Sequence, residues 1–387
     1  MKFSIIIGML FAKSAVGQQE VPCTSNDIVV FGDSFSDTGN LFAMTDGGLP
    51  PGPPYDAGRF TNGGVWIEYL ADLLKLNPPA PFYSDQEGTN YAIAGAASGS
   101  DEDTTWTAAL TGATITLPSK GVRLQTQDFL NNCGADCCSS EMLFAIWAGA
   151  IDFAMLGEGP TYMNIIENIK DSIKDLIGAG ATKILVLNLP QLASTPAGVG
   201  VYPSLFVNVS LPTGLADSVE MYNADLKCAL TEINMDNKNV NIIHADITNL
   251  FDMAASNPGK FGLDDTEDTG IPRLDEAALF LESSLNYLNA DNALWFDGVH
   301  PTTTFHKVLA ESVLEIMTKS PKATKSPKAT KCPKSPKSTK APKAPKSTKA
   351  PKAPKSTKAQ KSKKGAKSNK APKSTKSPKT GKKQQRK

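Results

Sequence analysis

Phe31-Gly-Asp-Ser-Phe-Ser-Asp-Thr-Gly-Asn40 follows an apolar, β-branched run that begins at Ile28. A short run of this kind that ends in glycine is typical of a buried strand that stops at a tight turn. The turn would place the Ser34 hydroxyl at the carboxyl end of the strand, where open α/β sheets bind their ligands. Taken alone, a serine beside an aspartate in a turn is more often a helix cap than a nucleophile. The interpretation of Ser34 as a nucleophile therefore requires a base elsewhere in the chain.

A carboxylate and a histidine lie close together near residue 300. In Trp295-Phe-Asp-Gly-Val-His-Pro301, Asp297 precedes His300 by three residues, and the proline begins a stretch with apolar residues at helical spacing. A nucleophilic serine needs a base that takes its proton and a group that orients that base. Of the other two histidines, His306 falls within the expected helix and His244 follows a strand-like run. Both are interpreted as packing or surface residues, so His300 is the candidate base.

Four sequence blocks together resemble those of the GDSL lipase/esterase family of SGNH hydrolases, over about residues 28–317. The nucleophile block is Phe31-Gly-Asp-Ser-Phe-Ser-Asp-Thr-Gly-Asn40. Gly58-Arg-Phe-Thr-Asn-Gly63 is similar to a second landmark of the family, and Asn90-Tyr-Ala-Ile-Ala-Gly-Ala-Ala-Ser98 to its glycine block. Asp297-Gly-Val-His-Pro301 is similar to the terminal block. The combination is far more specific than any one block.

The resemblance implies a role for each candidate site residue. Ser34 would be the nucleophile, His300 the base and Asp297 the residue that orients His300. The backbone N–H groups of Ser34 and Gly95 would form the oxyanion hole. The resemblance implies no metal and no cofactor.

One position departs from the family pattern. The third block of the family is Gly-x-Asn-Asp, in which the asparagine side chain is a further oxyanion donor. Trp147-Ala-Gly-Ala-Ile-Asp-Phe153 aligns Gly149 and Asp152 with that block but has Ile151 at the asparagine position. Isoleucine donates no hydrogen bond, and loss of one such donor costs about a hundred- to a thousand-fold in rate. We expect catalysis to be weakened by Ile151.

The segments alternate as in an α/β protein. Together with the resemblance, this predicts a three-layer α/β/α sandwich around a central, mostly parallel sheet of the SGNH, flavodoxin-like kind. The acidic, threonine-rich residues 98–120 are expected to form an irregular loop. Strands are expected at residues 28–31, 91–94, 142–147, 183–187 and 240–243, and helices at residues 66–76, 162–177, 215–233 and 302–317.

The candidate site residues fall just after strand-like runs or just before a helix, where parallel strands converge on one edge of a sheet. Tyr55, Phe60 and Trp66 are candidates for lining a substrate cleft. The alternative for each of them is an ordinary core or surface-loop position.

The charge of the chain is divided sharply. Residues 1–318 contain 14 Lys and Arg residues and all 39 acidic residues, whereas residues 319–387 contain 26 basic residues and no acidic one. We therefore expect one acidic domain, residues 18–318, followed by a basic tail. An acidic surface favours solubility and says little about the fold.

Residues 1–17 have the features of a secretory signal peptide. A lysine at position 2 precedes an apolar run of about ten residues, and Ala15-Val-Gly17 offers a small-residue cleavage site. The alternative is a buried amino-terminal strand. Six cysteines and one glycosylation sequon, Asn208-Val-Ser210, agree with export, and in an oxidising compartment disulfides are favoured over a zinc cluster at residues 133–138. We expect a secreted protein, associated with a cell wall.

The tail, residues 319–387, is a regular polycation of low complexity. From residue 319 to residue 382 every third residue is lysine, and Ser, Pro, Ala and Thr fill most other positions. Such a segment cannot bury a core and is expected to be disordered. Its expected partner is a polyanionic surface such as acidic polysaccharide, silica or phosphorylated matrix. Nuclear DNA is a rival partner that the signal peptide argues against, and weak docking on the acidic domain is a third possibility.

The sequence thus predicts a secreted serine esterase or lipase of the GDSL kind, acting on acetylated carbohydrate or a short-chain lipid. The alternative is a catalytically impaired SGNH-fold protein that binds the cell wall or matrix. A nucleic-acid-binding protein is the weakest reading. The acyl group, the alcohol, the disulfide pairing and the oligomeric state do not follow from the sequence.

Overall fold

Four apolar pentapeptides form the central sheet in the computed structural model, which describes residues 24, 26–85, 88–107, 114–133, 141–155, 162–199, 214–263 and 292–319. The strands are all parallel, in the order β1 (Ile28–Gly32), β4 (Leu143–Trp147), β5 (Lys183–Leu187) and β6 (Asn241–Ala245). Every residue of β1 and β4 is buried, as expected for strands with both faces covered. A Cβ on Gly32 would lie 2.3 Å from the carbonyl oxygen of Trp147, so β1 can end beside β4 only with glycine there.

The predicted strand at residues 91–94 is not a regular strand, although the segment does run parallel to β1. Val30 bridges to Asn90, and the N–H groups of Tyr91 and Ile93 donate to the carbonyls of Val30 (2.8 Å) and Gly32 (3.2 Å). On the outer edge, the Asn40 amide donates to the carbonyls of Asn90 and Ala92. The Asn40 side chain therefore makes hydrogen bonds that the backbone of a neighbouring strand would otherwise make. With this segment counted, the sheet has the flavodoxin-like order, and the predicted fold class is confirmed.

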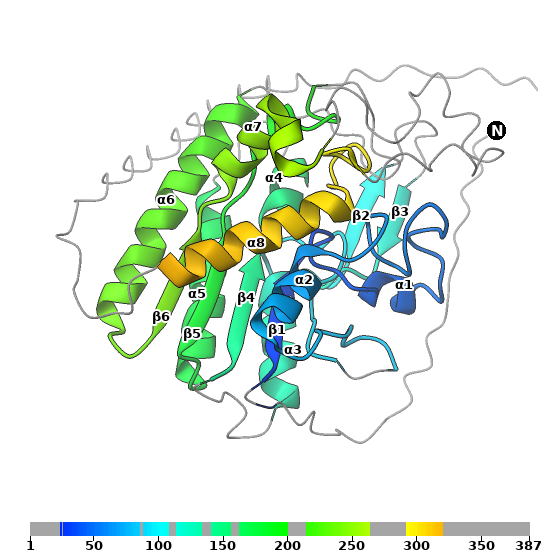
Figure 1. Ribbon diagram of the computed structural model, residues 1–387. Helices are drawn as coiled ribbons and strands as arrows, with labels where there is room; N and C mark the ends of the chain where they lie inside the picture. Colours follow the sequence, from blue (N-terminus) through cyan, green and yellow to red (C-terminus); the bar gives the residue numbers. More distant parts are fainter. Residues whose placement is uncertain are drawn as a thin grey trace, which may run out of the picture. The chain divides into compact units, whose positions relative to one another are not determined.

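Helices cover both faces of the sheet (Figure 1). On one face, α2 (Trp66–Leu74) packs against α8 (Thr303–Lys319). On the other, α3 (Val122–Asn132) packs against α5 (Met163–Gly178), and α6 (Leu215–Asp236) packs against α5 and β6. The buried face of α5 repeats at helical spacing: Ile165, Ile166, Ile169, Ile173 and Leu176.

Several elements were not predicted. The irregular loop expected at residues 98–120 contains the antiparallel pair β2 (Thr104–Thr107) and β3 (Thr114–Leu117), and α3 begins directly after it. Threonine and isoleucine favour strands, so the loop prediction gave too little weight to β-branched residues. The remaining elements are short: α1 (Asn40–Met44), α4 (Ala150–Met155), α7 (Thr248–Ser256) and two 3₁₀ turns, Leu192–Ser194 and Pro258–Phe261.

Some predictions concern residues outside the described part of the chain. The signal peptide (residues 1–17), the glycosylation sequon at Asn208 and the tail from residue 320 onwards are among them. Of the cysteines, Cys133 and Cys228 are described, and Cys133 is disulfide-bonded, which agrees with the expected disulfides. None of the described helices has the length and apolar character needed to cross a membrane.

Candidate active site

Ser34 lies in the turn that follows β1, at the edge of the sheet where β1 and β4 end. The turn is held by Asp33, whose carboxylate accepts the N–H of Phe35 at 3.1 Å and whose carbonyl accepts the N–H groups of Ser36 and Asp37. Ser34 is buried, and its Oγ lies 2.8 Å from Nε2 of His300, across 266 positions of sequence. The Ser34 side chain thus bonds to the candidate base. It does not cap helix α1, which was the alternative interpretation of this serine.

His300 and Asp297 share a tight loop that leads into α8. Asp297 Oδ2 lies 2.6 Å from Nδ1 of His300, and Oδ1 accepts the N–H groups of Val299 at 2.8 Å and His300 at 2.7 Å. The Phe296 N–H donates to the His300 carbonyl at 2.7 Å and closes the loop. Burial by itself would raise the pKa of Asp297, but attraction to His300 and these hydrogen bonds outweigh it and lower the pKa. Asp297 is therefore held as a carboxylate.

This geometry decides which ring nitrogen carries the proton. An ionised carboxylate only accepts hydrogen bonds, so the Nδ1–H of His300 donates to Asp297. Nε2 is then left as the acceptor that faces the Ser34 hydroxyl. In this arrangement a serine proton can pass to a neutral imidazole, whose resulting charge is balanced by Asp297. The structure brings together the three side chains that the sequence singled out.

Asp37 caps α1 and ties it to the glycine block. Its carboxylate accepts the N–H groups of Gly39 (2.8 Å), Asn40 (2.6 Å) and Leu41 (3.2 Å), and that of Ala94 (2.8 Å). Burial raises the pKa of Asp37 to about 6 against the effect of these four donors. Asp37 was not among the residues predicted from the sequence. An aspartate two residues before Gly39 and the apolar helical stretch that follows is a cap signal that could have found it.

Gly95 follows directly on the backbone that Asp37 holds. Its φ of 84° is a left-handed conformation that glycine adopts without strain. Within the described residues, the backbone N–H groups of Gly95 and Ser34 have no hydrogen-bond acceptor. Backbone N–H groups without an acceptor are the kind of donor that an oxyanion hole uses.

Ile151 lies in the first turn of α4, directly after β4. It is half-buried and packs against an apolar cluster that includes Tyr55, Phe60 and Phe296. The next residue, Asp152, accepts hydrogen bonds from the Ser98 N–H (2.8 Å) and hydroxyl (2.6 Å). The α4 turn is thus fixed to the end of the glycine block, but Ile151 brings no polar group to the site.

Asp33 is a buried carboxyl next to the candidate nucleophile. Its Oδ2 has no hydrogen-bond partner within the described residues. Burial raises its pKa to about 7, with attraction to His300 opposing and repulsion from Asp152 adding to the shift. The site therefore contains two buried acids whose pKa values shift in opposite directions, downward for Asp297 and upward for Asp33.

The remaining candidates divide between site and core. Tyr55 donates its hydroxyl to Asp297 Oδ2 at 2.8 Å, and the Phe60 ring lies 5.2 Å from the His300 ring. The Trp66 side chain is fully buried in the core, and its indole N–H donates to the Ser36 hydroxyl. His306 is buried in α8, and His244 is half-buried in β6. The prediction that both histidines are packing or surface residues is confirmed.

Comparison with known proteins adds a family match to this geometry. The sequence model of the family described as GDSL-like Lipase/Acylhydrolase matches residues 28–313. That range contains every candidate site residue and runs from the first residue of β1 into α8.

Individual relatives are similar over most of the chain. A phosphatidylcholine-sterol acyltransferase from Aeromonas hydrophila is 27% identical over 73% of this chain and 88% of its own length. A GDSL esterase/lipase from Arabidopsis thaliana is 26% identical over 74% of this chain and 84% of its own. Among solved structures, a member of the lipolytic G-D-S-L family from Veillonella parvula aligns with a TM-score of 0.39 and 15% identity, over 76% of this chain and 98% of that one.

Proposed function

We propose, starting from the fact that this chain belongs to the GDSL-like lipase/acylhydrolase family, that it cleaves esters with Ser34, His300 and Asp297. Family membership makes it a carboxylic ester hydrolase. The observation that carries the residue assignment is the continuous chain of short contacts from Ser34 Oγ through His300 to Asp297, at 2.8 Å and 2.6 Å.

In the proposed first step, Ser34 Oγ attacks the ester carbonyl while His300 Nε2 takes the hydroxyl proton. The imidazolium that forms is stabilised by Asp297, which already accepts the Nδ1–H. The negative charge on the former carbonyl oxygen is held by the N–H groups of Ser34 and Gly95. His300 then gives the proton to the leaving alcohol, and an acyl-enzyme on Ser34 remains.

In the second step, water attacks the acyl group with His300 as base, and Ser34 is released with its proton restored. Every proton transfer uses one nitrogen, Nε2, so the two steps need the same geometry. With Ile151 in place of a side-chain donor, the hole has two donors. The rate is expected to be about a hundred- to a thousand-fold below that of a three-donor site. Activated esters should therefore be turned over more readily than unactivated ones.

The substrate we propose is an acetylated carbohydrate or a short-chain lipid. Apolar side chains pack around the site, among them Phe60, Ile151 and Phe296, and they support a small apolar acyl group. The protein would work outside the cell, delivered by residues 1–17. Residues 319–387 would hold it on a polyanionic surface of the wall or matrix, where ester groups of a polysaccharide are concentrated.

A short-chain nitrophenyl ester tests the assignment. The full-length protein should hydrolyse it, and Ser34→Ala should lose the activity to background. Ser100→Ala, at an exposed serine outside the turn, is the control and should retain most of the activity. Equal turnover by the wild type and Ser34→Ala would contradict the proposal.

A further inference from the structure

The block Gly58-Arg-Phe-Thr-Asn-Gly63 has no part in the chemistry described so far, yet it is bonded to the loop that carries His300. The Thr61 hydroxyl donates to the Pro301 carbonyl at 2.8 Å. The Asn62 side-chain oxygen accepts the N–H of Thr303, the first residue of α8, at 2.9 Å. The block therefore lies directly against the residues that follow the candidate base.

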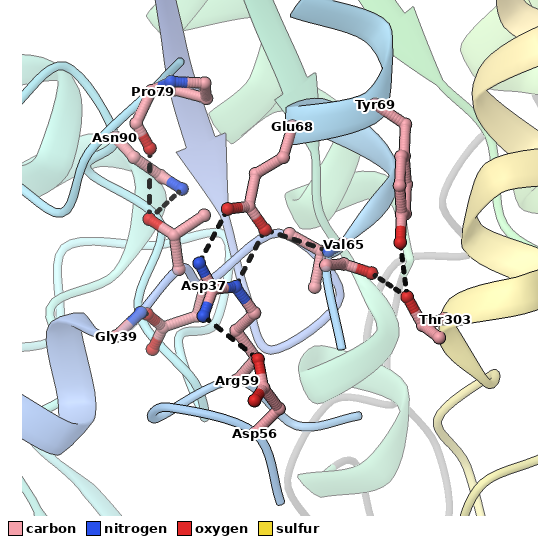
Figure 2. A network of polar contacts seen from close by, with 12 residues as sticks. Asp37, Gly39, Asp56, Arg59, Val65, Glu68, Tyr69, Pro79, Asn90 and Thr303 are labelled. Atoms are coloured by element: carbon pink, nitrogen blue, oxygen red, sulfur yellow. Dashed lines mark hydrogen bonds and ion pairs between the residues drawn. The ribbon is translucent and has the colours of Figure 1, made fainter. Parts of the chain in front are cut away.

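An ion pair fixes the same block to α2 (Figure 2). Arg59 donates from Nε and from a terminal nitrogen to the two oxygens of Glu68, at 2.8 Å and 2.7 Å. Glu68 Oε2 also accepts the Val65 N–H at the start of α2, at 2.9 Å. Arg59 also contacts Asp56, the residue that follows Tyr55 in sequence, at 3.4 Å. Residues 55–63 are thus braced between α2 and α8.

Tyr55, at the start of residues 55–63, makes the contact between this segment and the candidate active site. Its hydroxyl donates to Asp297 Oδ2 at 2.8 Å, and its side chain is buried. The ring packs edge-on against Phe296 with centroids 5.1 Å apart and lies 5.7 Å from the Phe60 ring. The phenol therefore has little freedom to leave Asp297.

The donors to Asp297 are of two kinds. The Val299 N–H, the His300 N–H and the His300 Nδ1–H come from the loop of Asp297 itself, and they turn with that loop. Within the described residues, Tyr55 is the one donor that comes from elsewhere in the chain. This bond is made to Oδ2, the same oxygen that orients His300.

We propose that Tyr55 is a positioning residue for the hydrolase reaction, acting through Asp297. It fixes the carboxylate in the orientation that keeps His300 Nε2 on Ser34 Oγ, and it withdraws charge from Oδ2. This role rests on the proposed function, since it assumes that Asp297 orients the base. The block of residues 58–63 then serves to hold Tyr55 in place.

Tyr55→Phe removes the donor and keeps the ring. We expect kcat on a nitrophenyl ester to fall about tenfold, as for a hydrogen bond to a charged group, with KM changed less than about twofold. Without the phenol, Asp297 Oδ2 carries more charge and favours the protonated imidazole. The acid limb of the kcat/KM profile should therefore move to higher pH by about half a unit. Tyr162→Phe is the matched control, because Tyr162 donates to Asp225 away from the site.

A double-mutant cycle separates positioning from general damage. If Tyr55 acts through Asp297, Tyr55→Phe should cost less than about twofold in an Asp297→Ala background, measured as the rate of labelling by a serine-directed phosphonate. An equal tenfold loss in both backgrounds, or an acid limb that does not move, would overturn the proposal. Persistence of activity in Ser34→Ala would instead remove the proposed function, so the two failures are distinguishable.

Discussion

Ile151 is the residue at which this chain differs from the chemistry its family leads one to expect. It lies half-buried in the first turn of α4, beside Asp152, whose bonds to Ser98 fix that turn. The turn that carries Ile151 is therefore fixed, and we expect an asparagine there to reach the site. The apolar side chain contributes instead to the cluster around Phe60 and Phe296.

Ile151→Asn should restore that donor. We expect kcat on a nitrophenyl ester to rise by tenfold or more, since one oxyanion donor accounts for about a hundred- to a thousand-fold in rate and a new side chain recovers part of it. Ile151→Leu controls for the change in packing. If Ile151→Asn is no faster than Ile151→Leu, the two backbone donors are sufficient and Ile151 does not limit the rate.

The candidate triad could be predicted from sequence because its residues lie in short blocks of recognisable sequence. Two blocks, around Ser34 and His300, carry all three side chains. The bond of Asp37 to Ala94 and the bond of Tyr55 to Asp297 could not be predicted in the same way. Asp37 acts on Ala94, and Tyr55 acts on Asp297 across 242 positions, so each contact exists only after folding.

At the scale of the elements, α8, which directly follows the loop of His300, packs against α2. The Trp66 N–H at the start of α2 donates to His306 Nδ1 in α8 at 3.2 Å. The Thr303 hydroxyl bonds to the Gly64 carbonyl at 3.0 Å and to the Tyr69 hydroxyl at 2.6 Å (Figure 2). These bonds join the carboxyl-terminal helix to a helix from the first quarter of the chain.

His306 makes this contact sensitive to acid. Burial, with a smaller contribution from repulsion by His300, lowers the pKa of His306 to about 3, below its ordinary value of 6.5. Between these values the unfolded chain binds a proton that the folded chain does not. The free energy of unfolding therefore falls as pH drops through this window, by about 1.4 kcal/mol per unit from this group.

His306→Gln retains an acceptor for the Trp66 N–H. It should remove the contribution of His306 to the pH dependence of the unfolding free energy. From pH 6.5 to pH 4.5 the wild type should lose roughly 2–3 kcal/mol more unfolding free energy than the variant, in urea titrations at the two pH values. His244 is less buried, so His244→Gln should reduce the pH dependence of the unfolding free energy by less than His306→Gln does. Parallel pH dependences for the wild type and His306→Gln would contradict this account.

Long, strongly periodic elements were predicted well, and segments bonded by side chains were not. The four strands of the sheet and helices α2, α5, α6 and α8 lie within a few residues of their expected positions. Residues 91–94 have a strand-like sequence, but the Asn40 and Asn90 side chains take their edge hydrogen bonds. The helix α3 has few apolar residues, and its Gln125 is buried because it bonds the backbone of Gly32. Because α3 buries a polar side chain, its sequence lacks the regular spacing of apolar residues by which a helix is predicted.

For the whole molecule, the division of charge is the feature that the site does not explain. All 39 acidic residues lie in residues 1–318, and the lysines of residues 319–382 recur at every third position. A chain that is acidic over residues 1–318 and basic in its tail would be repelled from a polyanion by the first part and bound by the second. We propose that the tail sets where the esterase works.

Retention on pectin, silica and DNA tests this role. At low salt the full-length protein should be retained, with binding that weakens linearly in a plot of log K against log salt, while residues 1–318 alone should pass through. A full-length variant with glutamine at the tail lysines is the control for length. Equal retention of the full-length and shortened proteins would exclude tethering by the tail, and preferential retention on DNA would favour the nucleic-acid partner.

The central claim is that the Ser34 hydroxyl is the nucleophile and His300 its base. A serine-directed phosphonate tests it most directly, because covalent labelling needs no knowledge of the substrate. Peptide mapping of the treated full-length protein should find one phosphonate on Ser34, with labelling strongly slowed in His300→Ala and absent in Ser34→Ala. A label on another residue, or equal labelling of the Ser34→Ala protein, would contradict the claim.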